Sequence, residues 1–158
     1  MARIKDVIDE CLTVSTAFVD ISSDTYEELS AINWEDNDKD YPFMLIDKNF
    51  NVINNSYTRE QLPREQTYTC QFYFMDTFDE FEKTSVTLQE KQDTLLTIAD
   101  KYFAELKTRT DNGSKGFIVG DINFNAIDEQ NNDRVIQLNY SVDFIVKRED
   151  CATGTFNY

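Results

Sequence analysis

Residues 68–82 read YTCQFYFMDTFDEFE, and the aromatic first half of this stretch decides the fold class. Apolar side chains recur there at every second position, and two of the intervening positions, Tyr73 and Met75, are apolar as well. A period of two is typical of a β-strand, because successive side chains of a strand point to opposite faces of its sheet. Two apolar faces indicate either burial on both sides or one face that is reserved for a partner.

Two helices are predicted on either side of this strand along the chain. Apolar residues at helical spacing predict an amphipathic helix over about residues 2–16. Thr87 and Glu90 match the capping box that begins many helices, and a broad apolar stripe behind them predicts a helix that ends near Thr108. An Asp-x-x-Glu motif within residues 24–32 predicts a further short helical turn.

Three more strands are predicted from the remaining apolar patterns. The run YPFMLID at residues 41–47 indicates a buried strand. Alternating apolar residues over 118–126 and 136–146, joined by the polar residues 128–133, predict an antiparallel hairpin. Residues 48–66 are polar and irregular, and we expect them to form a long loop.

The predicted element order is therefore α-β-β-α-β-β. This order favours an α+β sandwich, in which helices pack on one face of a mainly antiparallel four-stranded sheet. We expect residues 1–147 to form a single domain and residues 148–158 to form a C-terminal arm, which orders only against a neighbour.

The charge of the chain is strongly one-sided. Its 158 residues include 30 Asp and Glu against 15 Lys and Arg, a formal net charge of −15 at pH 7. Direct wrapping of nucleic acid needs clustered cations and is disfavoured. An acidic surface that repels DNA is useful, however, where DNA must slide past without binding. No stretch is long and apolar enough for a membrane span.

Residues that could carry catalysis are sparse. The chain has no histidine, which removes the commonest general base and the commonest metal ligand. The cysteines Cys11, Cys70 and Cys151 are far apart and odd in number, so we expect neither a zinc site nor a disulfide framework. A reduced, cytoplasmic environment fits these cysteines best.

Carboxylates follow the aromatic strand and are the strongest candidates for chemistry. Asp76, Asp79, Glu80 and Glu82 could pair as catalytic acids or hold a divalent ion. The phenylalanines between them better fit a linker that leads into the capped helix. The acidic run at 36–40 matches only the opening of a calcium loop. We therefore predict no catalytic residue, no metal and no cofactor.

Several segments together resemble a known family. These are DYPFMLID at 40–47, the stretch from YTCQFYFM at 68 to the helix ending in FAEL, and NNDRVIQLNYSVDF at 131–144. They resemble the small neck and tail-completion proteins, with a tail-terminator-like fold, of tailed bacteriophages that infect Bacteroidetes, including crAss-like phages. The resemblance covers about residues 40–147. The segment at 19–40 and the C-terminal arm depart from the family's pattern.

This resemblance implies a structural virion protein rather than an enzyme. Proteins of this kind assemble into rings of six or twelve copies between portal and tail or at the end of the tail tube. It implies other neck, portal or tail proteins as partners, passage of DNA without sequence-specific binding, no membrane, and assembly in the host cytoplasm. The residues expected at subunit interfaces are Tyr73, Met75, Tyr57, Arg59, Leu62, Arg64, Phe156 and Tyr158.

Two other classes of function compete with a ring subunit. An acidic cytoplasmic module could bind a basic host protein, or could inhibit one by mimicking DNA. A hydrolase could use the carboxylates at 76–82, and it would then bind a divalent ion there. Self-association into an oligomer separates a ring subunit from both of these classes.

Overall fold

A computed structural model describes residues 2–19, 21–26, 42–57, 63–77, 85–130 and 135–147. Helices and strands account for most of these residues. In chain order they are α1 (Ile4–Val14), the π-helical turn η1 (Ser15–Val19), β1 (Ser22–Tyr26), β2 (Phe43–Asp47), β3 (Asn51–Tyr57), β4 (Pro63–Thr77), α2 (Ser85–Thr110), β5 (Phe117–Gln130) and β6 (Val135–Lys147).

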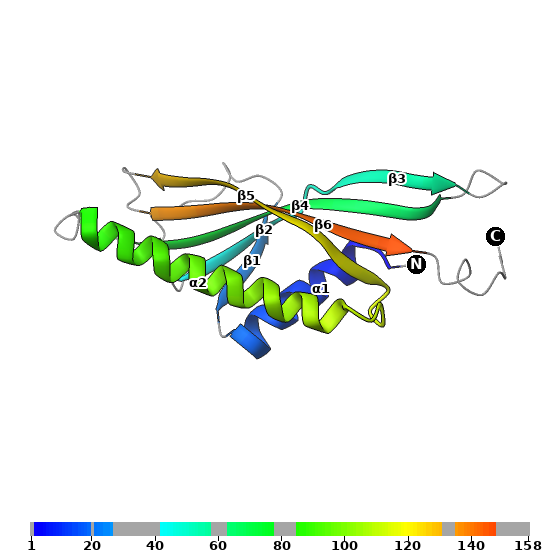
Figure 1. The fold of residues 1–158 in the computed structure, drawn as a ribbon, viewed down its shortest axis with the longest axis horizontal. Coiled ribbons are helices and arrows are strands. Elements are labelled where there is room, and N and C mark those ends of the chain that lie inside the picture. Colours follow the sequence, from blue (N-terminus) through cyan, green and yellow to red (C-terminus); the bar gives the residue numbers. More distant parts are fainter. Residues whose placement is uncertain are drawn as a thin grey trace.

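The strands of the described residues form one six-stranded sheet in the order β1-β2-β4-β6-β5, and β3 pairs with β4 beside this path. The β1–β2 pair is parallel and the other pairs are antiparallel. Helices α1 and α2 lie on the same side of the sheet (Figure 1). The α+β class is thus confirmed, whereas the expected four-stranded sheet is replaced by a larger, mixed one.

Strand β4 organises the sheet. It pairs with β6 from Glu65↔Lys147 to Thr77↔Val135, which uses nearly its whole length. Its other edge is divided between β3, which pairs with the first half of β4, and β2, which pairs with the second half. The aromatic stretch that predicted a strand is therefore the central strand of the fold.

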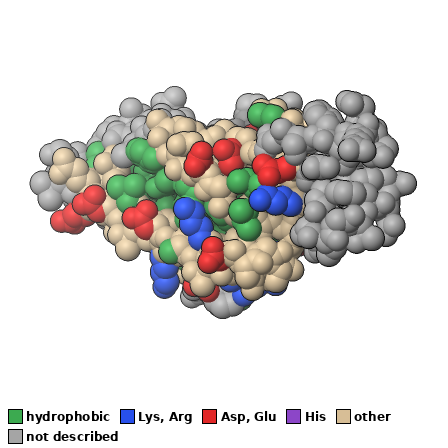
Figure 2. Space-filling view, turned by 45° about the vertical axis from the view of Figure 1, so that its right-hand side comes forward, with side chains coloured by type: hydrophobic (Ala, Val, Ile, Leu, Met, Phe, Trp, Pro, Cys, Tyr) green, Lys and Arg blue, Asp and Glu red, His purple; other side chains and the backbone are tan. Residues whose placement is uncertain are grey.

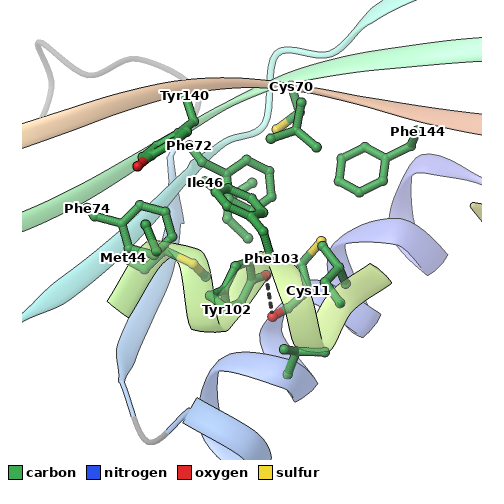
Figure 3. Close-up of a cluster of buried hydrophobic side chains, with 14 of the residues drawn as sticks. Cys11, Met44, Ile46, Cys70, Phe72, Phe74, Tyr102, Phe103, Tyr140 and Phe144 are labelled. Carbon is green, nitrogen blue, oxygen red and sulfur yellow. Dashed lines mark hydrogen bonds between the residues drawn. The ribbon is translucent and has the colours of Figure 1, made fainter. Parts of the chain in front are cut away.

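The core lies between the sheet and the helices. Fully buried aromatic side chains from β4 meet those of α2, with ring centroids 5.6 Å apart for Phe72 and Phe103 and 5.7 Å apart for Phe74 and Tyr102 (Figure 3). The Tyr102 hydroxyl donates a hydrogen bond of 2.9 Å to the carbonyl oxygen of Cys11 on α1. This bond joins the two helices inside the core, where its loss would leave a buried polar group without a partner.

The first helix agrees with the prediction, but the helical turn predicted at 24–32 is wrong where it is described. Asp24 lies in β1 opposite Leu45, and its carboxylate accepts a hydrogen bond of 2.7 Å from the N–H of Thr25. An Asp side chain satisfies a neighbouring N–H equally well in extended chain and at a helix start, so its spacing to Glu27 was ambiguous. Residues 27–32 lie outside the described residues.

The second helix begins earlier than its capping motif suggests. α2 starts at Ser85, so Thr87 lies within the helix and does not begin it. The predicted apolar stripe is confirmed, because Leu95, Ala99, Tyr102 and other α2 side chains of the stripe are buried in the core.

The loop expected at 48–66 is wrong for much of its length. Residues 51–57 form β3, and β4 begins at Pro63. Residues 58–62 lie outside the described part of the chain. Both Val52 and Ile53 are exposed, although they point to opposite faces of the sheet. A strand that is exposed on both faces needs no alternation of apolar and polar residues, and this is why its sequence looks like a loop.

The predicted hairpin is confirmed as β5 and β6, but β5 is irregular. The register shifts between Val119 and Ile122, and again between Phe124 and Ala126. Ile118 therefore pairs with Ile145 on the face away from the helices, whereas Ile122 and Phe124 lie on the helix side. A bulge inserts an extra residue and reverses the facing of everything beyond it, so the simple alternation predicted for β5 is wrong.

Candidate interaction surface

The face of the sheet that is turned away from the helices is here called the open face. Its side chains come from alternate positions of the strands, starting with Thr67, Thr69 and Gln71 on β4 and Ser141, Asp143 and Ile145 on β6. The residues between these positions point to the helices and form the core. All six of these side chains are half-buried, as expected for central strands whose face no helix covers in the described structure.

Hydrogen-bonded polar side chains occupy the middle of the open face. The Gln71 amide donates to the Ser141 hydroxyl at 2.9 Å and accepts from the Asn125 amide at 3.3 Å. The Thr69 hydroxyl donates to the carboxylate of Asp143 at 2.7 Å. We call these five residues the amide patch. Because the side chains hold one another across three strands, the patch presents a preformed set of donors and acceptors.

An apolar row, here called the isoleucine row, borders the amide patch. Direct pairing across four strands places Ile53 beside Thr67, Thr67 beside Ile145, and Ile145 beside Ile118. Ile53 is 50% exposed, and the other two isoleucines are half-buried. Apolar area of this kind is available to a partner, and its removal from water would favour binding by about 25 cal/mol per Å².

Asp143 is the only charged residue in the amide patch and the isoleucine row. The whole chain, by contrast, is 28% charged and carries a net charge of −15. Depletion of charged residues is typical of the central part of protein interfaces. Figure 2 shows that on one side of the molecule apolar side chains gather in groups with acidic and basic side chains around them.

Two of the predicted interface residues, Tyr73 and Met75, lie next to each other at one end of the open face. Met75 is fully buried, in a cluster with Phe43, Leu45 and Val135, and the half-buried Tyr73 packs against this cluster. Burial raises the pKa of Tyr73, and the nearby Asp47 carboxylate raises it further. Met75 is thus covered within a single chain, so only Tyr73 offers surface to a neighbour; its role at an interface stays a prediction.

The other predicted interface residues are described only in part. Tyr57 ends β3, where it pairs with Pro63, and Arg64 follows in β4, so the fold brings these two segments together in one hairpin. Arg59, Leu62, Phe156 and Tyr158 lie outside the described residues.

The hairpin of β3 and β4 carries the open face beyond the helices. Its far end extends past the end of the helix layer (Figure 1). All of Asn51, Val52, Ile53 and Asn54 are exposed. None of the sequence patterns above predicts this surface, but the sequence holds a signal for it: residues 49–57 contain no charged residue in a chain that is rich in charge.

The carboxylates after β4 are only partly described. The Asp76 carboxylate accepts a hydrogen bond of 2.8 Å from the N–H of Thr77. Asp79, Glu80 and Glu82, like the acidic run at 36–40, lie outside the described residues. Among the residues with a described position, no three His, Cys, Asp or Glu side chains gather in a way that could hold a metal ion.

The two described cysteines are inert core residues. Cys11 and Cys70 are each 1% exposed. Burial raises the pKa of the Cys11 thiol to about 12 and also raises the pKa of Cys70. Because the thiolate is the reactive form, neither side chain is suited to act as a nucleophile.

The chain matches no protein-family model and no curated protein. No helix within the described ranges is long and apolar enough to cross a membrane. The features that bear on function are the open face, its projecting hairpin, and the charge around them.

Proposed function

We propose that this protein is a structural subunit of a homo-oligomeric ring in the neck or tail of a tailed bacteriophage. Such a ring connects the portal to the tail, or completes the tail, and DNA passes through its lumen. The observation that supports this proposal most directly is the charge-poor centre of the open face, formed by the amide patch and the isoleucine row, in a chain of net charge −15.

Electrostatics explains why this observation matters. Two copies with the same large negative charge repel each other, and burying a carboxylate without a partner is costly. They can associate closely only through a surface that lacks unpaired carboxylates. In the amide patch the one carboxylate, Asp143, already accepts a hydrogen bond from Thr69. The amide patch and the isoleucine row are thus a suitable surface for contact between copies, while the remaining acids suit a lumen that does not bind DNA.

The test is the mass and shape of the full-length protein in solution. Sedimentation velocity over a range of concentrations is expected to show a discrete assembly, and negative-stain images of that species are expected to show rings. A protein that stays monomeric at all concentrations, alone and with portal or tail proteins, would contradict the proposal.

The net charge also favours a second candidate, an acidic module that binds a basic protein or mimics DNA. This candidate predicts a one-to-one complex with a basic protein and no self-association. Pull-down from infected cells separates the two, because a ring subunit is expected to retain virion proteins whereas a DNA mimic retains a nucleic-acid-binding protein.

A further inference from the structure

Strand β3 is an unprotected edge of the sheet. Among the described residues it pairs with β4 alone, so no described strand pairs with the backbone N–H and C=O groups of its outer edge. Proteins normally protect such edges with charges, prolines, bulges or short length, because an open edge accepts strands from other chains. Val52 is 42% exposed and Ile53 is 50% exposed, and residues 49–57 carry no charge.

The other two edges of the sheet are better protected. β1 has only five residues and includes the exposed Asp24. β5 is long, but two register shifts interrupt it, and the exposed Asp121 lies within the first of them. β3 is also irregular near its end, beyond Asn54, which leaves Asn51 to Asn54 as the regular stretch that can accept another strand.

The chain contains a segment whose chemistry matches this edge. Residues 151–158, CATGTFNY, contain no charged side chain, and their Thr, Phe and Tyr residues favour extended chain. Phe156 and Tyr158 are two positions apart, so in a strand both would lie on one face. β6 ends beside the projecting hairpin, because its last residue, Lys147, pairs with Glu65 of β4 and their side chains form an ion pair of 3.7 Å.

The geometry of the sheet favours a second copy over the same chain as the source of the segment. β6, β4 and β3 are neighbours in that order, so a new strand outside β3 lies three strand spacings from β6, about 14 Å. Full extension from Lys147 to Cys151 also reaches about 14 Å, and β4 and β3 occupy the direct path. The whole segment therefore cannot lie along β3 of its own chain, whereas a neighbouring copy imposes no such limit.

We propose that residues 151–158 of one copy add as an extra strand to β3 of a neighbouring copy. This inference rests on the proposed function and names the contact by which the ring would close. The contact joins two different surfaces, so each copy gives one segment and receives another, as the subunits of a ring must. Main-chain hydrogen bonds would supply affinity, and the alternate side chains would supply specificity.

Cross-linking between two full-length variants tests where the segment docks. One variant carries Ile53→Cys, the other carries Phe156→Cys, and both carry Cys151→Ser, while Cys11 and Cys70 are too buried to react. A bis-maleimide reagent added to the mixture is expected to produce a covalent pair that joins position 53 of one variant to position 156 of the other, identified by mass spectrometry. Either variant alone is expected to lack this 53–156 product.

Matched substitutions test whether the contact drives assembly. Ile53→Asp places a carboxylate at the proposed interface, and we expect it to weaken self-association by at least about tenfold. Deletion of residues 151–158 is expected to have a similar effect. Phe124→Asp is the control, because Phe124 is 48% exposed on the other long edge strand, β5, and we expect the assembly of this variant to be unchanged. Circular dichroism melting checks whether each variant remains folded.

The outcomes separate this inference from the proposed function. Assembly that survives both Ile53→Asp and the deletion overturns the docking of residues 151–158 and leaves the ring proposal standing. A full-length protein that never assembles, with no 53–156 product from the mixed variants, overturns both. The cross-linked pair, together with loss of assembly in Ile53→Asp but not in Phe124→Asp, supports both.

Discussion

Tyr102 connects the two helices through one buried hydrogen bond. Its hydroxyl donates to the Cys11 carbonyl at 2.9 Å, and its ring is fully buried among aromatic side chains. Tyr102→Phe keeps the ring and leaves the carbonyl without this donor, so we expect the free energy of unfolding to fall by about 1–2 kcal/mol. Urea denaturation measures the change.

Tyr140→Phe is a suitable control for Tyr102→Phe. Tyr140 is also buried, and among the described residues no hydrogen bond of its hydroxyl is seen, so its substitution is expected to change stability less. Equal losses in the two variants would show that the bond to Cys11 is not what Tyr102 contributes.

Buried ionisable groups predict a loss of stability in alkali. Burial raises the pKa of Cys11 from 9.0 to about 12 and that of Tyr140 from 10.0 to about 12. The native state therefore keeps these protons when the unfolded chain has lost them. The stability that these groups contribute is fully present below about pH 9 and is lost as the pH rises towards 12, with a contribution from Cys11 on the order of 4 kcal/mol.

Urea titrations at several pH values above 8 measure this slope. Cys11→Ala removes the ionisable thiol, and its free energy of unfolding is expected to depend less steeply on pH than that of the natural chain. The same slope in both proteins would mean that other groups carry the effect.

At the scale of elements, the turn between α2 and β5 depends on two glycines with positive φ. Gly113 has a φ of +71° and an added Cβ would meet nothing within 4 Å, whereas at Gly116, with a φ of +85°, the Cβ would lie 3.2 Å from that of Ala2. Gly113→Ala is expected to cost about 1–2 kcal/mol, from backbone strain alone. Gly116→Ala is expected to cost more, because the segment before α1 must also move.

Thermal unfolding of these two single variants provides the comparison. Each is the other's control, since they share the type of substitution and the sign of φ. Similar melting temperatures in the two variants would argue against the contact between Ala2 and the turn.

Elements with one buried face could be predicted from the sequence, and those without one could not. α2 and β6 each present a continuous apolar face to the core, so the spacing of their apolar residues is visible in the sequence. β3 is exposed on both faces and has no period to detect. In β5, register shifts alter the facing of side chains, and only the pairing with β6 reveals them.

At the scale of the whole molecule, net charge makes assembly sensitive to salt. Copies of charge −15 repel each other, and salt screens this repulsion. We therefore expect self-association to strengthen as NaCl rises from about 0.01 M, where the Debye length is about 30 Å, to about 0.15 M, where it is about 8 Å. Sedimentation velocity across this range checks the prediction.

The opposite dependence is expected of a DNA mimic. Its complex with a basic protein is held by attraction between unlike charges, which salt weakens. Association that falls steadily as salt is added would therefore favour the acidic binding module over the ring subunit.

Composition alone established the acidic character of the chain, the absence of histidine and a core rich in aromatic side chains, because these depend only on which residues are present. Periodicity established the α+β class, because one-sided burial imprints a repeat on the order of residues.

Tertiary pairing decided the rest. It covered Met75 within the chain, aligned Ile53, Thr67, Ile145 and Ile118 in one row, and left the edge of β3 open. These features depend on which strands lie side by side and in what register, and residues that meet there are far apart in the sequence. Local sequence patterns record the facing of neighbouring residues along a strand, but they do not record the partner across it.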